Sequence, residues 1–172
     1  MSDALTIKLD GVEGIDKIVR RMNDPQVKAI TSQHMNISLI MIENPAKMNG
    51  PGDTGRGVAS ITHSVGDIGS DIQGIVGSMK DHMKWQEYGT GLLYDGPPPR
   101  SSRRHWPPSA ALETWARRHG IASGYLVARA IGLRGGLRPK KFLRNAWDSV
   151  QGGVITEMSK ILPEITRRMA GK

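Results

Sequence analysis

Two apolar seams at helical spacing constrain the fold of this chain more than any other feature. The first steps by three or four residues along Val27, Ile30, His34, Ile37 and Met41. The second follows the same rule over a longer run: Leu143, Trp147, Val150, Val154, Met158, Ile161 and Ile165. Steps of three and four keep side chains on one face of an α-helix. The pattern predicts two long amphipathic helices, each needing a surface to cover its apolar face.

Residues that start or stop helices set the expected limits of these two elements. Asp24 is expected to cap the first helix, with Pro25 as its first residue, and Asn44-Pro45 is expected to end it. The second helix is expected from Pro139 onward, weakened at Gly152-Gly153 and kinked or ended at Pro163.

The segments between and before the two helices predict a small antiparallel sheet. The span 58–76 is expected to form two strands around a turn at Gly69-Ser70-Asp71, because apolar and polar residues alternate on its first half. Lys84–Thr90 is expected to add a third strand-like piece. A further short strand is expected at Leu5–Leu9, followed by a short helix over Ile15–Met22. The expected fold class is α+β, with one face of the sheet packed on the helices.

Residues 91–138 are expected to form an insertion within a single domain that spans residues 1–172. Proline-rich composition predicts a loop at 91–108, and Ser109 is expected to cap a helix that runs to His119. A second short helix is expected over Tyr125–Leu133, ended by Gly135-Gly136. A hydrophobic content of 38% with 23% charged residues suits a soluble domain of this kind.

The charge of the chain is concentrated in and just after this insertion. The net charge is +8, but the stretch from Arg100 to Arg144 alone carries +10, because Glu113 is its only acidic residue. Such a block attracts phosphate backbones, and it also suits a solvated surface or contacts to acidic neighbouring subunits. Both interpretations stay open at this point. The candidate contact residues are Arg100, Arg103, Arg104, Arg117, Arg118, Arg134, Arg138, Lys140 and Lys141.

No pattern in the chain predicts catalysis. Cysteine is absent, the five histidines are isolated, and the segment 50–57 fails as a phosphate-binding loop because Arg56 and Gly57 replace the required Lys and hydroxyl. Asp81-His82 with Glu87 is the nearest approach to an acid–base cluster. His34 is expected to be a packing residue rather than a ligand. We therefore expect a binding or assembly protein, with no catalytic, cofactor-binding or metal-binding residues.

The sequence also predicts a soluble protein without a membrane partner. The N-terminal residues lack the basic and apolar regions of a signal peptide, and the longest apolar stretch, Ile37–Ile42, is far shorter than the ~20 residues of a membrane span. The absence of cysteine fits a reducing cytoplasm.

Five segments, taken in order, resemble the neck or tail-completion proteins of tailed bacteriophages. They are Val12–Asp16, Asp53–Arg56, Trp85–Thr90, the helical segment Trp106–Gly120 and Arg138–Ala146. Trp85–Thr90 is similar to an aromatic-x-glutamate-aromatic-glycine-threonine signature, and Arg138–Ala146 to the entry of the family's last helix. The chain departs from the family pattern at Lys141, which stands before Phe142 in place of a frequent proline, and at Asn145, which replaces another.

The resemblance implies a structural virion protein at the head-to-tail junction. Copies of the chain would form a ring, six-fold in expectation, between the head connector or stopper protein and the tail terminator or tail tube protein. Genomic double-stranded DNA would pass through the ring, and the protein would lie in the host cytoplasm before assembly. The residues that match family motifs and are expected to be structural are Thr54, Gly55, Arg56, Glu87, Tyr88, Gly89, Thr90, Pro139, Phe142 and Leu143.

Two other functions remain as alternatives. The basic block alone would suit a nucleic-acid-binding module that acts on its own, and such a module predicts salt-dependent binding by the isolated monomer. An enzyme such as a metal-dependent nuclease is the third possibility, and it lacks a recognisable site.

Overall fold

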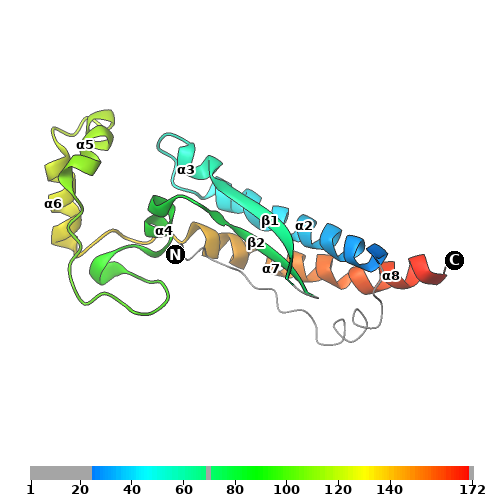
Figure 1. Cartoon of the computed structure of the whole chain (residues 1–172). Coiled ribbons are helices and arrows are strands. Elements are labelled where there is room, and N and C mark those ends of the chain that lie inside the picture. The colour runs from blue at the N-terminus through cyan, green and yellow to red at the C-terminus, as the bar shows by residue number, and fades with distance from the viewer. Residues whose placement is uncertain (1–24, 69–70, 171–172) are drawn as a thin grey trace. The chain divides into compact units, whose positions relative to one another are not determined.

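The computed structural model describes residues 25–68 and 71–170, and their fold is α+β (Figure 1). The predicted strand at Leu5–Leu9, the predicted helix at Ile15–Met22 and the Asp24 cap lie outside the described residues. The chain divides into two compact units. Unit 1 comprises residues 1–79 and 143–172, and unit 2 comprises residues 80–142. The predicted insertion at 91–138 falls within unit 2, while the single-domain interpretation stays a prediction.

The first predicted helix is the longest element of unit 1. Helix α2 spans Pro25–Met48 and buries the seam of Val27, Ile30 and His34, although Ile37 stays half exposed. The prediction that Asn44-Pro45 ends this helix is wrong, since Pro45 lies inside it. Proline removes one intrahelical hydrogen bond, but Ala46, the next residue, is fully buried and favours another turn.

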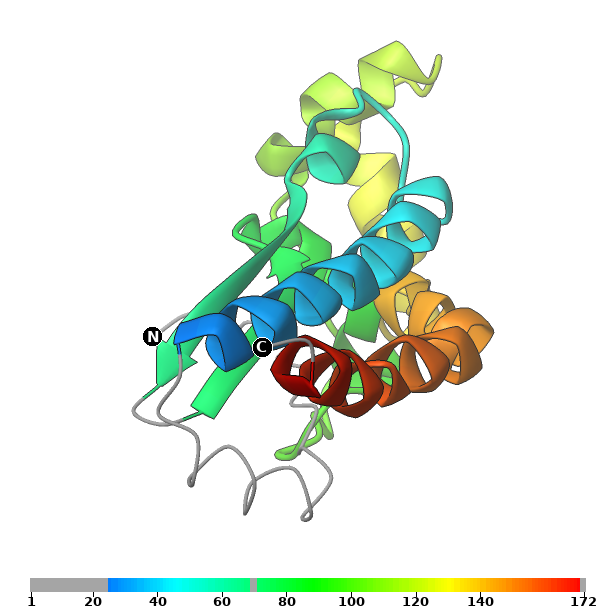
Figure 2. The same cartoon turned by 90° about the vertical axis from the view of Figure 1, so that its right-hand side faces the viewer.

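A two-stranded antiparallel hairpin packs against α2. Strand β1 spans Ile61–Ile68 and strand β2 spans Asp71–Ser78, in a register that pairs Ser64 with Ile75. Figure 2 shows the hairpin lying along α2. The absence of a side chain at Gly74 allows β2 to lie close to α2, because a Cβ there would stand 2.8 Å from Met35 Sδ on α2. The predicted span starts too early, since Val58 lies in the short helix α3 (Arg56–Ala59).

The predicted third strand at Lys84–Thr90 is wrong, because this segment is mostly helix. Helix α4 spans Asp81–Tyr88 and buries Met83 and Glu87, which are four residues apart on one helical face. Gly89 ends the helix with a φ of 72°. The aromatic residues of this segment favour a strand by propensity, but the buried positions repeat at helical spacing, and tertiary packing decides the outcome.

The second predicted seam forms two helices in place of one. Helix α7 spans Phe142–Ser159 and helix α8 spans Ile161–Ala170, with the break at Lys160 and Pro163 in the first turn of α8. Gly152-Gly153 does not interrupt α7. Ile161 and Ile165 of α8 pack on Val27 and Ile30 of α2, which closes the core of unit 1 (Figure 2).

Helix α7 starts at Phe142 and not at Pro139, since the preceding residues bond elsewhere. The Lys140 N–H donates to the Gln86 carbonyl at 2.6 Å, and the Lys141 N–H donates to the Glu87 carbonyl at 3.3 Å. Lys141 also has a φ of 54°, which no helix interior allows. Residues 140–141 are therefore bound to the end of α4, within unit 2.

Two short helices make up most of the rest of unit 2. The single-turn helix η1 (Gly91–Leu93) is followed by a loop, then by α5 (Ser109–Arg118) and α6 (Gly124–Arg134), which pack on each other. Ser109 is the first residue of α5 and makes no capping bond, so its predicted cap role is wrong. Gly135 ends α6 as predicted, with a φ of 97°. Of the helices in the described ranges, none is long and apolar enough to cross a membrane.

Candidate functional site

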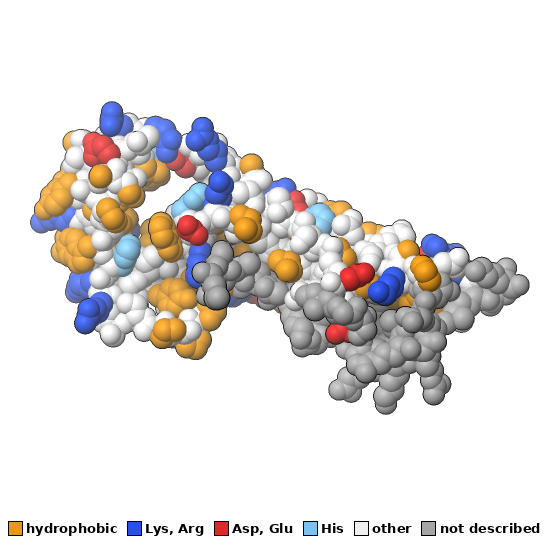
Figure 3. Space-filling model, viewed as in Figure 1, with side chains coloured by type: hydrophobic (Ala, Val, Ile, Leu, Met, Phe, Trp, Pro, Cys, Tyr) orange, Lys and Arg blue, Asp and Glu red, His pale blue; other side chains and the backbone are white. Residues whose placement is uncertain are grey.

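The predicted contact residues lie on one unit and give it the whole net charge of the protein. Unit 2 contains twelve Lys and Arg against four Asp and Glu, whereas the rest of the chain contains twelve of each. All the predicted basic contact residues belong to unit 2 and are exposed, apart from the half-buried Lys141. Figure 3 shows blue Lys and Arg side chains around the part that contains α5 and α6. The structure thus collects these residues on one compact body.

Two carboxylates of unit 2 are engaged locally and leave most of the arginines without a partner. Asp95 pairs with Lys141 at 2.7 Å and lies 3.9 Å from Arg100. Glu113 accepts a hydrogen bond from the Gly124 N–H at 2.7 Å, at the N-terminus of α6. In the part of the chain that the structure describes, no ion pair is formed by Arg103, Arg117, Arg129, Arg134 or Arg138. Their positive charge is available to an external anion.

Arg104 differs from the other arginines because it has an internal role. Its guanidinium donates to the Leu133 carbonyl at 2.7 Å and to the Gly132 carbonyl at 3.4 Å. These are carbonyls of the last turn of α6, at the negative end of the helix dipole, and the Gly132 carbonyl also accepts from the Gly135 N–H at 3.0 Å. Arg104 therefore caps α6, a role that its place in a run of basic residues does not reveal.

The Trp85–Thr90 motif is hydrogen-bonded in unit 2 to Leu137, the residue just before the Arg138–Ala146 motif. The Thr90 N–H donates to the Leu137 carbonyl at 3.0 Å, and the Leu137 N–H donates to Thr90 Oγ1 at 2.9 Å. Gly89 fits between them with positive φ, and a Cβ there would stand 2.6 Å from the Leu137 oxygen and 2.9 Å from Pro139 Cδ. Only glycine suits both the conformation and the space.

The other motif residues divide into buried and exposed positions. Glu87, Tyr88, Phe142 and Leu143 are buried. Thr54, Gly55 and Arg56 are exposed just before β1, where Gly55 has a φ of 74° and starts the short helix α3. These three residues shape the turn into the hairpin.

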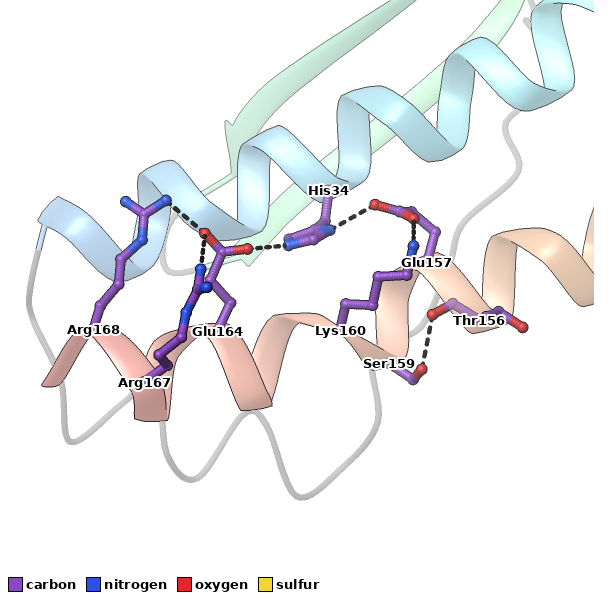
Figure 4. Close-up of polar contacts among 8 residues, drawn as sticks. All are labelled: His34, Thr156, Glu157, Ser159, Lys160, Glu164, Arg167 and Arg168. Carbon is purple, nitrogen blue, oxygen red and sulfur yellow. Dashed lines mark hydrogen bonds and ion pairs between the residues drawn. The ribbon is translucent and has the colours of Figure 1, made fainter. Parts of the chain in front are cut away.

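A buried histidine with two carboxylate partners is the main feature that the sequence did not reveal. His34 of α2 lies with Nδ1 2.8 Å from Glu157 of α7 and Nε2 3.1 Å from Glu164 of α8 (Figure 4). Each ring nitrogen of His34 therefore has a carboxylate oxygen as its partner. His34 is a core residue, as expected, and it also ties α2 to both C-terminal helices.

Further cations stabilise the two carboxylates of this cluster. Hydrogen bonds from Lys160 and then from His34 lower the pKa of Glu157 below its ordinary value. Hydrogen bonds from His34 and then from Arg168 lower the pKa of Glu164. Since the two carboxylates lie on opposite ring nitrogens, they cannot meet on one metal ion. Among the described residues, no group of three or more His, Asp or Glu side chains is placed to hold a metal.

A second histidine contact lies between α2 and the hairpin. Glu43 bonds to Lys47 and to His63 of β1, and His63 Nε2 lies 3.0 Å from Asn36 Oδ1. Burial raises the pKa of Glu43, but the bonds from Lys47 and His63 outweigh it and hold that pKa below its ordinary value. This cluster, like that of His34, fastens one element of unit 1 to another.

Comparison with known proteins yields no relative. No protein-family model matches the chain, and no significant match is found among curated proteins or among solved structures.

Proposed function

We propose that this chain is a structural protein of the head-to-tail junction of a tailed bacteriophage. It would form a closed ring of copies, six in expectation, between the head connector or stopper and the tail terminator or tail tube, with genomic double-stranded DNA in the lumen. The role is assembly without chemical turnover. The proposal extends the resemblance of the sequence motifs to this family.

The joint between the two motifs is the observation that carries this proposal. Lys140 and Lys141, within Arg138–Ala146, donate their N–H groups to the Gln86 and Glu87 carbonyls of Trp85–Thr90, where the chain enters and leaves unit 2. The two segments that resemble motifs of one family therefore meet in the fold, although they are far apart in sequence. Their contact gives the motif residues a shared task, which is to hold the two ends of unit 2 together.

The charge distribution supports the same proposal. A ring built from one kind of chain needs a heterologous interface that closes, so each copy must present two different surfaces. This chain has a unit with no net charge and a unit with +8. Exposed arginines on the second unit suit either an acidic surface of a neighbour or the phosphates of DNA in the lumen.

The direct test is to image virions of the phage that encodes this chain. Electron cryomicroscopy of the junction should show a ring whose subunits contain a long helix on a two-stranded hairpin, as in unit 1. Virions whose junction contains no density or peptide from this chain would overturn the proposal.

Arginines of the loop should matter more for assembly than for folding. We expect the double variant Arg100→Ala/Arg103→Ala to melt within about 2 °C of the parent, because both side chains are exposed and make at most a long ion pair. The same variant should reduce incorporation into virions several-fold. The matched control is Arg104→Ala, which removes the α6 cap and should lower stability by about 1 kcal/mol. A double variant that assembles normally would show that these arginines have no role at the junction.

A nucleic-acid-binding module that acts alone is the second candidate, favoured by the same unpaired arginines. Native mass spectrometry combined with electrophoretic shift assays on duplex DNA separates the two functions. The module predicts a monomer that binds duplex DNA in infected cells but is missing from virions.

A further inference from the structure

One face of α6 presents large apolar side chains and arginine together. We call it the Trp106 face, and it consists of Trp106, Tyr125, Leu126, Arg129 and Leu133. Tyr125, Arg129 and Leu133 are spaced by four residues, and Leu126 and Leu133 by seven, so all four lie on one side of the helix. The exposed fractions are 52% for Trp106, 61% for Tyr125 and 58% for Leu133. Trp106 rests on Gly132, which is seven residues from Tyr125, so these exposed side chains follow one side of the helix and are not scattered.

Three contacts hold Trp106 in its half-exposed position against this face. Its indole lies on Gly132 of α6, where a Cβ would stand 2.2 Å from the ring. The preceding residue, His105, donates its N–H to the Gly135 carbonyl at 3.2 Å. Arg104 is fastened to the last carbonyls of α6 through its guanidinium. One side of the indole ring packs on α6, and the rest of the ring is exposed. A ligand can therefore bind the ring without the entropic cost of first ordering the loop.

The charged residue within this face is an arginine, Arg129, which lies between Tyr125 and Leu133 on the same side of α6. Glu113, the nearest acidic residue in sequence, is bound to the N-terminus of α6 through the Gly124 N–H. A ligand that uses the whole face would present an anionic group to Arg129 and flat apolar groups to the two aromatic rings.

We propose that the Trp106 face binds single-stranded nucleic acid. Bases would stack on Trp106 and Tyr125, while Arg129 would contact a phosphate. Duplex DNA fits the charge but hides its bases, so it cannot use the aromatic rings. An apolar protein surface with acidic edges is the competing partner, and the experiment distinguishes it. The proposal does not rest on the junction role, since a ring around duplex DNA needs no base stacking.

The test measures binding of the full-length protein to a fluorescein-labelled oligothymidine of about 15 nucleotides, within the site sizes of single-strand-binding folds, by anisotropy at low salt. We expect Trp106→Ala to weaken binding roughly 5- to 100-fold, the range for loss of one base-stacking residue. Trp106→Phe, which keeps an aromatic ring, should retain most of the affinity. Trp85→Ala is the matched control, because Trp85 lies in the same unit with 54% exposure, but on α4. Arg129→Gln should reduce the slope of log affinity against log salt by about 0.7.

Several outcomes would overturn the proposal. Equal affinity for the single strand and for a duplex of the same length, with Trp106→Ala unchanged, would mean purely electrostatic binding. Folded Trp106→Phe binding as weakly as Trp106→Ala would exclude stacking. Absence of binding at about 50 mM salt, where phosphate contacts are strong, would also exclude it. If Trp106→Ala then lowered the oligomer mass in native mass spectrometry, the face would be a protein interface. Far-ultraviolet circular dichroism of each variant establishes that it is folded.

Discussion

His34 occupies a position in a helical seam that an aliphatic side chain normally fills. Its spacing on α2 places it inside the core of unit 1, and there it meets Glu157 and Glu164 from helices more than 120 residues away in sequence. A buried polar ring costs free energy unless each of its nitrogens has a hydrogen-bond partner. Glu157 and Glu164 are these partners, so the cluster links α7 and α8 to α2.

Replacing this histidine should destabilise the protein in a pH-dependent way. We expect His34→Leu to lower the melting temperature at pH 7 by roughly 5 °C, because two carboxylates at the helix contacts lose a donor. The pKa of Glu157 and of Glu164 is lowered in the folded protein. The ionised carboxylates therefore stabilise the fold above their unfolded pKa, and this stabilisation is lost as the pH falls through the lower folded pKa. The parent should lose stability below about pH 5 more steeply than the variant does.

Thermal melts of both proteins between about pH 7 and about pH 3.5, a range that spans the ordinary glutamate pKa, check this expectation. His82→Leu is the control, because His82 is exposed on α4, and its effect should be small at every pH. A difference between His34→Leu and the parent that stays constant or grows as the pH falls would contradict the role given to the two carboxylates.

At the scale of elements, the contact between the hairpin and α2 depends on a single missing side chain. Gly74 of β2 faces Met35 and Leu39 of α2, and a Cβ there would come within 2.9 Å of both. Gly66, the other glycine in the middle of the hairpin, is exposed, and a Cβ added to it would meet no atom within 4 Å. One glycine is thus required by packing, and the other is not.

This difference predicts opposite effects of one substitution at the two positions. Gly74→Val should cost about 2 kcal/mol of unfolding free energy, because the hairpin and α2 must separate to admit the side chain. Gly66→Val should be neutral or stabilise by up to about 1 kcal/mol, since valine favours strands and loses less entropy than glycine. Urea unfolding monitored by circular dichroism measures both. Equal effects at the two sites would contradict the packing described for β2.

The elements also show where sequence reasoning succeeds. The two long seams, the hairpin strands and the glycine at the end of α6 were predictable, because each depends on local periodicity or on a backbone conformation that few residues adopt. Helix α4 was not, since Trp85 and Tyr88 carry strand propensity and its buried face appears only once Met83 and Glu87 have partners. The continuation of α2 through Pro45 likewise depends on the burial of Ala46.

At the scale of the whole molecule, charge separates along the same line as the compact units. Unit 2 carries +8, and the remainder carries no net charge. Basic residues should therefore contribute to polyanion binding according to the unit in which they lie and not simply according to their number.

Two variants of equal net charge test this expectation. Arg117→Gln/Arg138→Gln removes two charges from unit 2, and Lys28→Gln/Arg167→Gln removes two from unit 1, all at exposed positions. On a heparin column, the first variant should elute at clearly lower salt than the parent, and the second should elute close to it, because exposed charges act over about a Debye length. Identical elution of the two variants would show that the whole chain, and not unit 2, determines binding.

The helical seams, the hairpin, several chain breaks and the clustering of basic residues were all contained in the sequence, because they follow from local spacing and composition. Which residues act together depended on the folded chain alone. Folding brought Thr90 to Leu137, Arg104 to the end of α6, Trp106 onto Gly132 and His34 between Glu157 and Glu164. Each of these contacts joins residues far apart in the chain, and no local pattern of side chains encodes a distance between distant segments.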